Sequence, residues 1–149
     1  MNNIKKFINL SYQDKRLFIE AVYFQFYYKL SLNCISFNKI SKQFKKENLS
    51  DKMPDRALLF CIHTAVQRAN KVAFWKNRCL VCSLAARRMI EKRGINSTIH
   101  LAIRFVDQQK AVNNTFAYKQ TMEAHAWLTV GDFYVTPRLN EKFKEIYQF

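Results

Sequence analysis

The stretch CLVCSLAARRMIEKRG at 79–94, followed by STIHLAIRF at 97–105, contains the change of pattern that decides the fold class. Apolar residues in the first stretch recur at helical spacing, and Gly94 follows a basic last turn, as is typical of a helix C-cap. In the second stretch apolar and polar residues alternate, which indicates a strand with one buried face. We therefore predict a helix over 80–93 and a strand over 97–105.

Two more helices are predicted upstream of this stretch. Ser11 and Asp14 have the spacing of a capping box, and the apolar periodicity after them predicts a helix over 12–32. A proline and an aspartate open the segment 54–73, whose apolar stripe predicts the second helix. The lysine-rich stretch 38–51 between them is interpreted as a solvated helix or linker.

Strands are predicted downstream. Gly131 and Asp132 form a two-residue turn with glycine first, typical of a type II′ hairpin joining strands over 122–130 and 133–136. The amide-rich segment 106–121 is too long for a hairpin turn and is predicted to be a functional or mobile loop. Helices followed by antiparallel strands predict an α+β fold, with the sheet packed on the helix that begins near residue 80.

Composition limits the classes of function. A chain of 149 residues with 49% hydrophobic residues suits a single domain, and two glycines are too few for phosphate-binding or dinucleotide-binding loops. The net charge of +14 favours acidic partners such as a peptide, a nucleic acid or lipid headgroups. Polar residues interrupt the most apolar stretch, 17–37, so no transmembrane segment is expected. The first residues lack a secretory signal pattern, and a cytoplasmic location is expected.

Cys79 is the candidate nucleophile. It lies at the predicted start of a helix and follows Arg78, and both features favour the thiolate form. A buried structural cysteine is the alternative interpretation. A catalytic cysteine needs a histidine from elsewhere in the fold. His63 is expected to be a hydrogen-bonded structural residue, and His100 is expected to be solvated.

His125 is the candidate partner of Cys79. The small residues Ala124 and Ala126 flank it, and Trp127 lies on the same side of the predicted strand. If that side meets the start of the helix, the imidazole can pair with the thiol.

These motifs resemble a known family, the transglutaminase-like cysteine peptidases that remove leader peptides in lasso-peptide biosynthesis. The resemblance covers nearly the whole chain and implies a transglutaminase-like (papain-like) core over 56–149, preceded by a helical region with a basic linker over 1–55. In that family the cysteine and the histidine form a catalytic dyad supported by an acid. The matching residues are Arg78, Cys79, Leu80 and Val81; Ser83, Leu84, Ala85, Ala86 and Met89; Arg93, Gly94, Ile95, Ser97 and Thr98; Ala124 to Leu128; and Gly131, Asp132, Val135 and Thr136.

The resemblance also implies a reaction and its partners. Cys79 would attack the scissile carbonyl of a precursor peptide, without a metal ion or another cofactor. Trp75 and Trp127 are candidate walls of the substrate pocket. The implied partners are the precursor, a small leader-recognition protein and a ring-forming cyclase; no nucleic acid is expected.

The sequence departs from the family at three places. Cys82 stands where a polar residue is more common and creates a Cys-x-x-Cys spacing, but no second ligand pair follows, so a buried thiol is expected. The segment 106–121 is longer than usual.

The third departure is the acid that orients the histidine. Some relatives carry an aspartate about a dozen residues after the histidine, where this chain has Thr136 and a proline. A hairpin turning at Gly131 and Asp132 places residue 138 opposite His125, which leaves Asp132 about 20 Å away. Thr136, Asn140, a backbone carbonyl or a loop amide remain candidates for this role.

Two other functions are compatible with the sequence. One is a transglutaminase-like protein that has lost activity and only binds a partner. The other is a nucleic-acid or membrane-surface binder that uses the basic stretch 39–52 and the aromatic first helix, although these aromatic residues follow core spacing rather than an exposed platform.

Overall fold

The computed structural model describes residues 10–44, 49–50, 54–74, 79–112, 115–139 and 143–149. Side chains are described for these residues except 107–120. The elements are the helices α2 (Tyr12–Cys34), α3 (Phe37–Lys42), α4 (Arg56–Val72) and α5 (Cys79–Glu91), and the strands β1 (Thr98–Val112), β2 (Thr115–Val130), β3 (Phe133–Tyr134) and β4 (Lys144–Gln148).

The three long helices begin close to the predicted positions, and side-chain caps explain two of these starts. The Ser11 hydroxyl accepts a hydrogen bond from the Asp14 backbone N–H at 3.1 Å, so the predicted capping box is confirmed. Asp55 caps α4 by accepting from the Ala57 N–H at 2.9 Å. The α5 helix starts at Cys79, one residue before the predicted start.

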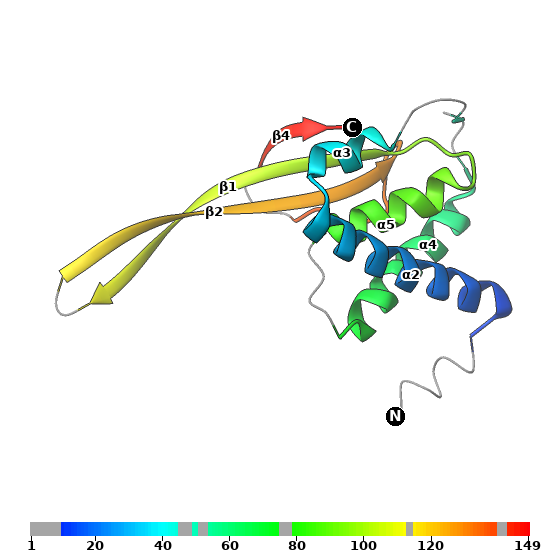
Figure 1. Cartoon of the computed structure of the whole chain (residues 1–149), viewed down its shortest axis with the longest axis horizontal. Coiled ribbons are helices and arrows are strands. Elements are labelled where there is room, and N and C mark those ends of the chain that lie inside the picture. The colour runs from blue at the N-terminus through cyan, green and yellow to red at the C-terminus, as the bar shows by residue number, and fades with distance from the viewer. Residues whose placement is uncertain (1–9, 45–48, 51–53, 75–78, 113–114, 140–142) are drawn as a thin grey trace.

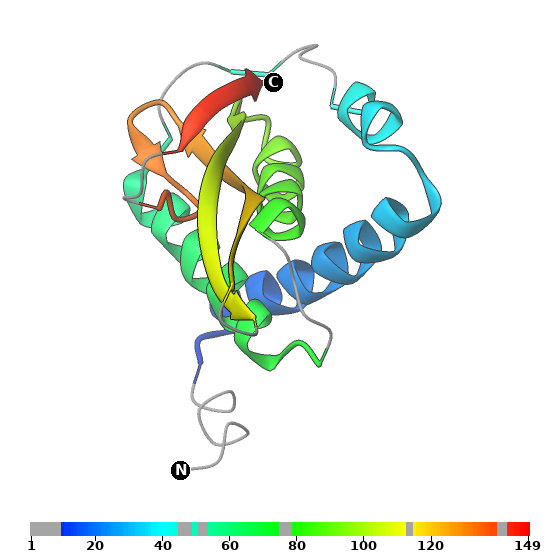
Figure 2. The same cartoon turned by 90° about the vertical axis from the view of Figure 1, so that its left-hand side faces the viewer.

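The strands form one antiparallel sheet in the order β3-β2-β1-β4. β4 was not predicted; it pairs with the edge of β1 (Figure 1). Ile99 on β1 and Leu128 on β2 are fully buried in the same core cluster as Leu84 and Ile90 of α5. The predicted packing of the sheet on this helix is therefore confirmed, and the fold is α+β. Figure 1 shows the helices gathered at one end of the sheet, and Figure 2 shows the same arrangement with the ribbon pointing toward the viewer.

The prediction of a loop over 106–121 is wrong. β1 and β2 pair residue by residue from Thr98↔Thr129 to Val112↔Thr115 and continue as a long two-stranded ribbon away from the helices (Figure 1). A ribbon that leaves the body has no buried face and needs no alternation of apolar and polar residues; the ladder of backbone hydrogen bonds defines it instead. For the same reason the face of β1 is not buried throughout, since Phe105 is 61% exposed.

The stretch 38–51 is more structured than a solvated linker. It contains most of the six-residue helix α3, whose lysines Lys39 and Lys42 are exposed as expected. Ile40 and Phe44, in contrast, are buried in the core, and the Phe44 ring stacks on Tyr28 of α2. Two apolar anchors in a polar segment therefore attach it to the helices.

Candidate active site

Cys79 is the first residue of α5, and its half-buried side chain lies against the outer edge of β2, the edge away from β1. Its thiol donates to the Ala124 carbonyl oxygen at an Sγ–O distance of 3.9 Å. One helical turn later, the Ser83 hydroxyl donates to the Ala126 carbonyl at 3.3 Å. Four residues of a helix span about 6 Å along its axis, and two residues of a strand span about 7 Å. The spacing of the two side chains on α5 therefore matches the spacing of the two carbonyls on β2.

His125 lies on β2 between these two alanines and pairs with Ala102 of β1. Its Nε2 atom is 2.9 Å from the carbonyl oxygen of Pro137. A carbonyl only accepts hydrogen bonds, so Nε2 carries the hydrogen in the neutral ring and Nδ1 keeps the lone pair. This tautomer leaves Nδ1 as the basic atom.

The fold thus brings the two candidate catalytic residues to neighbouring positions. The Cys79 thiol bonds to the backbone of the residue immediately before His125. Within the described part of the chain, this carbonyl, rather than the imidazole, is its hydrogen-bond partner. Catalytic hydrogen bonds are often long or unformed before substrate binds, so the arrangement is compatible with a dyad that closes by a side-chain rotation.

Two aromatic rings pack against the half-exposed imidazole. The Trp127 ring stacks on it with centroids 5.9 Å apart, and the Phe143 ring lies 5.7 Å away. Trp127 is only 3% exposed because His100 stacks on it at 5.2 Å and the Arg138 guanidinium lies 5.3 Å from its centroid. Trp127 therefore supports the histidine ring and offers little open surface to a substrate. Trp75 lies outside the described residues.

The structure separates Asp132 from the histidine. Val130↔Phe133 closes the hairpin, and Gly131 has the positive φ of 54° that the first turn position requires. Asp132 lies at this tip and forms an exposed ion pair with Arg56 at 2.7 Å. The tip placement predicted from the register is confirmed.

Thr136 is buried but does not contact the imidazole. Its hydroxyl accepts from the Leu128 N–H at 2.8 Å and lies 3.0 Å from the Ser83 hydroxyl. The group that reaches His125 is the backbone carbonyl of the next residue, Pro137. A backbone carbonyl was among the candidates predicted for this role. No sequence pattern identifies which carbonyl it is, because every residue has a carbonyl group.

The remaining cysteines and histidines have other environments. Cys82 is buried, and desolvation, with a smaller contribution from Cys79, raises its thiol pKa to about 12. Nδ1 of His63 is 2.9 Å from the Val135 carbonyl, in agreement with the structural role expected for it. The prediction of a solvated His100 is wrong, because its ring nitrogens form hydrogen bonds with Glu145 and Thr129, at 2.9 and 3.0 Å. Among the described residues, no three His, Cys, Asp or Glu side chains gather as a metal ion requires.

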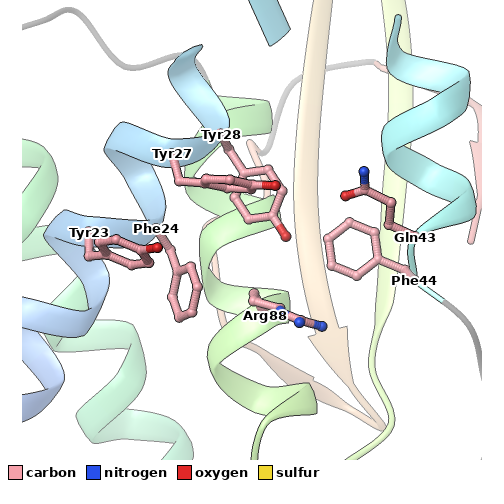
Figure 3. Close-up of a pocket in the computed structure, with 7 residues that line it drawn as sticks. All are labelled: Tyr23, Phe24, Tyr27, Tyr28, Gln43, Phe44 and Arg88. Atoms are coloured by element: carbon pink, nitrogen blue, oxygen red, sulfur yellow. The ribbon is translucent and has the colours of Figure 1, made fainter. Parts of the chain in front are cut away.

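A separate aromatic hollow of about 440 Å³ lies between α2, α5 and residues 43–44 (Figure 3). Tyr23, Tyr27 and Phe44 are among the residues that line it, together with Arg88. Arg88 follows Cys79 by nine residues, which is about 14 Å along the α5 axis. The hollow is therefore not part of the Cys79 and His125 site.

A protein-family model matches most of the chain. No curated protein and no solved structure matches the chain significantly. In the part of the chain that the structure describes, no helix has the length and apolar character needed to cross a membrane. The sequence profile of the transglutaminase-like superfamily matches residues 24–148, which include α5, β2 and both candidate catalytic residues. The chain therefore belongs to the transglutaminase-like superfamily.

Proposed function

We propose that this protein is a cysteine peptidase that removes the leader from a ribosomally made precursor peptide in lasso-peptide maturation. The superfamily includes cysteine peptidases with Cys-His-Asp triads, and its fold is compatible with this activity. The observation that carries the proposal is the hydrogen bond of Cys79, at the start of α5, to the residue that precedes His125. The motifs around these two residues support the substrate class.

The reaction proceeds in two steps. Nδ1 of His125 takes the Cys79 proton, and the sulfur attacks the scissile carbonyl carbon. The C–N bond then breaks, the leaving amine receives the proton from His125, and a thioester remains. Water, deprotonated by the same imidazole, attacks the thioester carbonyl; the C–S bond breaks and the Cys79 thiol is regenerated.

The chain supplies electrostatic stabilisation at two places. Backbone N–H groups at the start of α5 are not all used within the helix and are available to the oxyanion. Pro137 stands twelve residues after His125, in the region where some relatives carry the orienting aspartate. Its carbonyl orients the ring, as an amide does in papain-like peptidases.

Partners follow from the same proposal. The precursor peptide is the substrate, a small leader-recognition protein delivers it, and a ring-forming cyclase acts on the released core. The net charge of +14 favours an acidic leader or an acidic partner. The proposed location of the reaction is the cytoplasm.

Cleavage of a cognate precursor, followed by mass spectrometry, tests the proposal. Cys79→Ala should abolish cleavage, and His125→Ala should reduce kcat by about 10²–10⁴-fold. Cys34→Ala is the matched control for the cysteine variant, because Cys34 is an exposed free thiol at the end of α2, and it should retain activity. Cleavage by Cys79→Ala at the wild-type rate contradicts the mechanism. A wild-type protein that binds the precursor without cleaving it supports the alternative of an inactive binding protein.

A further inference from the structure

Two buried hydroxyls, those of Ser83 on α5 and Thr136 after β3, meet behind the candidate active site. Ser83 is fully buried and Thr136 is 2% exposed. A buried hydroxyl without a hydrogen-bond partner lowers the stability of the folded state by about 1–3 kcal/mol. The hydrogen bonds of these two hydroxyls therefore keep both side chains in place.

The hydrogen-bond directions between them are fixed by their neighbours. The Leu128 N–H donates to the Thr136 oxygen at 2.8 Å, and Ser83 donates its own proton to the Ala126 carbonyl. Thr136 therefore donates to Ser83 across the 3.0 Å that separates their oxygens. Each hydroxyl donates once and accepts once, in a single chain from the Leu128 N–H to the Ala126 carbonyl.

This chain of hydrogen bonds adjoins both candidate catalytic residues. Ser83 lies one turn after Cys79, and its acceptor Ala126 lies immediately after His125. Thr136 lies immediately before Pro137, whose carbonyl binds the imidazole. A shift of either hydroxyl therefore moves the helix start relative to β2, or moves the carbonyl that fixes the ring.

We propose that the Ser83 and Thr136 hydroxyls are positioning residues that set the geometry between Cys79 and His125. They tie the first turns of α5 to the outer edge of β2 and hold the Pro137 carbonyl against Nε2 of His125. The inference rests on the proposed Cys79 and His125 dyad, and the experiment below separates failure of the positioning role from failure of the dyad.

The test is the pH dependence of Cys79 alkylation by iodoacetamide, followed on the Cys79 peptide by mass spectrometry in the full-length protein. A paired histidine increases the thiolate fraction at low pH, so His125→Ala should move the alkylation midpoint upward. Thr136→Val, which keeps the shape and removes the hydroxyl, should move the midpoint in the same direction by about half a unit or more. Thr136→Ser should restore the wild-type profile.

Controls distinguish positioning from a general loss of stability. Ser97→Ala removes another buried hydroxyl, one without a hydrogen-bond partner among the described residues, and should leave the profile unchanged. If Thr136→Val does not fold, Ser83→Ala tests the other end of the chain of hydrogen bonds. A wild-type profile in a folded variant lacking either hydroxyl overturns the positioning role, and so does a failure of Thr136→Ser to restore it. An unchanged profile in His125→Ala overturns the dyad itself.

Discussion

Nε2 of His125 lies 2.9 Å from the carbonyl oxygen of Pro137, so a neutral main-chain group holds the ring that a carboxylate holds in Cys-His-Asp relatives. A carbonyl fixes the tautomer and the orientation of the ring as a carboxylate does. It adds less stabilisation to the imidazolium, because it carries no full charge. The side chain of residue 137 is therefore not required for this contact.

Replacement of Pro137 tests this point directly. Pro137→Ala keeps the carbonyl and should keep the pH profile of Cys79 alkylation close to that of the wild type. The added freedom of the unfolded chain should lower the free energy of unfolding by about 0.4–1 kcal/mol, measured by urea denaturation. A profile shifted as far as that of His125→Ala would show that the ring of the proline, and not its carbonyl, places the histidine.

Asp132 should be dispensable for the chemistry. It lies at the hairpin tip, where both members of its ion pair with Arg56 are about two thirds exposed. Exposed pairs contribute about 0–1 kcal/mol, and asparagine is tolerated in such turns, so Asp132→Asn should retain near-normal turnover and lose at most that much stability. Arg56→Gln removes the same pair from the other side and is the matched control. A large loss of turnover in Asp132→Asn alone would mean that this carboxylate reaches the imidazole during catalysis.

Cys82 should resist alkylation at pH 8. Burial raises its pKa to about 12, so the thiol is almost entirely protonated at that pH, and the thiolate is the reactive form. Cys34 is exposed and provides an internal reference in the same digest. Peptide mapping after iodoacetamide treatment should show modified Cys34 and unmodified Cys82 while the protein remains folded. Equal modification of the two would indicate that the start of α5 opens to solvent.

Most of the fold was predictable because its signals are local. The Ser11 capping box predicted the start of α2, the proline and aspartate at 54–55 predicted the start of α4 to within two residues, and the Gly131 turn predicted the hairpin that positions His125. The ribbon and β4 were missed because a strand that packs no face on a core shows no apolar alternation. In the site, Cys79 and His125 carry recognisable chemistry, whereas the Pro137 carbonyl and the pairing of Thr136 with Ser83 depend on contacts that no local pattern encodes.

Arg87 is a buried charge on which the core depends. Its guanidinium lies over the rings of Phe44 and Phe149, 4.6 and 4.9 Å from their centroids, and pairs with Glu91 at 3.2 Å. Arg87→Met leaves Glu91 with only the half-exposed Arg88 as a partner, at 3.5 Å, so the variant should lower the free energy of unfolding by up to about 3–5 kcal/mol. The double variant with Glu91→Leu should recover most of this loss. A double variant as unstable as the single one would place the contribution of Arg87 in its ring contacts and in its hydrogen bond to the Phe149 carbonyl, at 2.6 Å.

The stability of Arg87→Met should also depend on pH. Burial already raises the pKa of Glu91 above 4.5, against the opposing effect of Arg87, and loss of the guanidinium raises it further. The folded state then holds the Glu91 proton more tightly than the unfolded state does. Stability should therefore fall as the pH rises from about 4.5 through the folded-state pKa, more steeply than in the wild type. Urea denaturation at pH 4.5 and pH 7 measures the difference. An equal loss of stability at both pH values would show that the ionised Glu91 carboxylate is not the cause of the destabilisation.

The distal ribbon should be dispensable for folding. Phe105 and Met122, which pair across the ribbon where it leaves the body, are 61% and 63% exposed, so the segment beyond them starts outside the core. Val106 and Thr121 are cross-strand partners, and the Thr121 hydroxyl donates to the Val106 carbonyl at 3.3 Å. Replacing 107–120 by Asn-Gly joins these partners through a two-residue turn that suits an antiparallel pair.

Thermal unfolding of the shortened protein should show a midpoint within a few degrees of the wild type, because a change of about 1 kcal/mol shifts the midpoint by a few degrees in a domain of this size. The Cys79 alkylation profile should also be retained, since the carbonyls that Cys79, Ser83 and His125 contact all lie after the deleted segment, two on β2 and one at Pro137. A matched variant with 107–120 replaced by Gly-Ser-Gly-Ser, which does not favour a tight turn, should be less stable. Loss of cooperative unfolding in the Asn-Gly variant would show that the ribbon stabilises the sheet from outside the core.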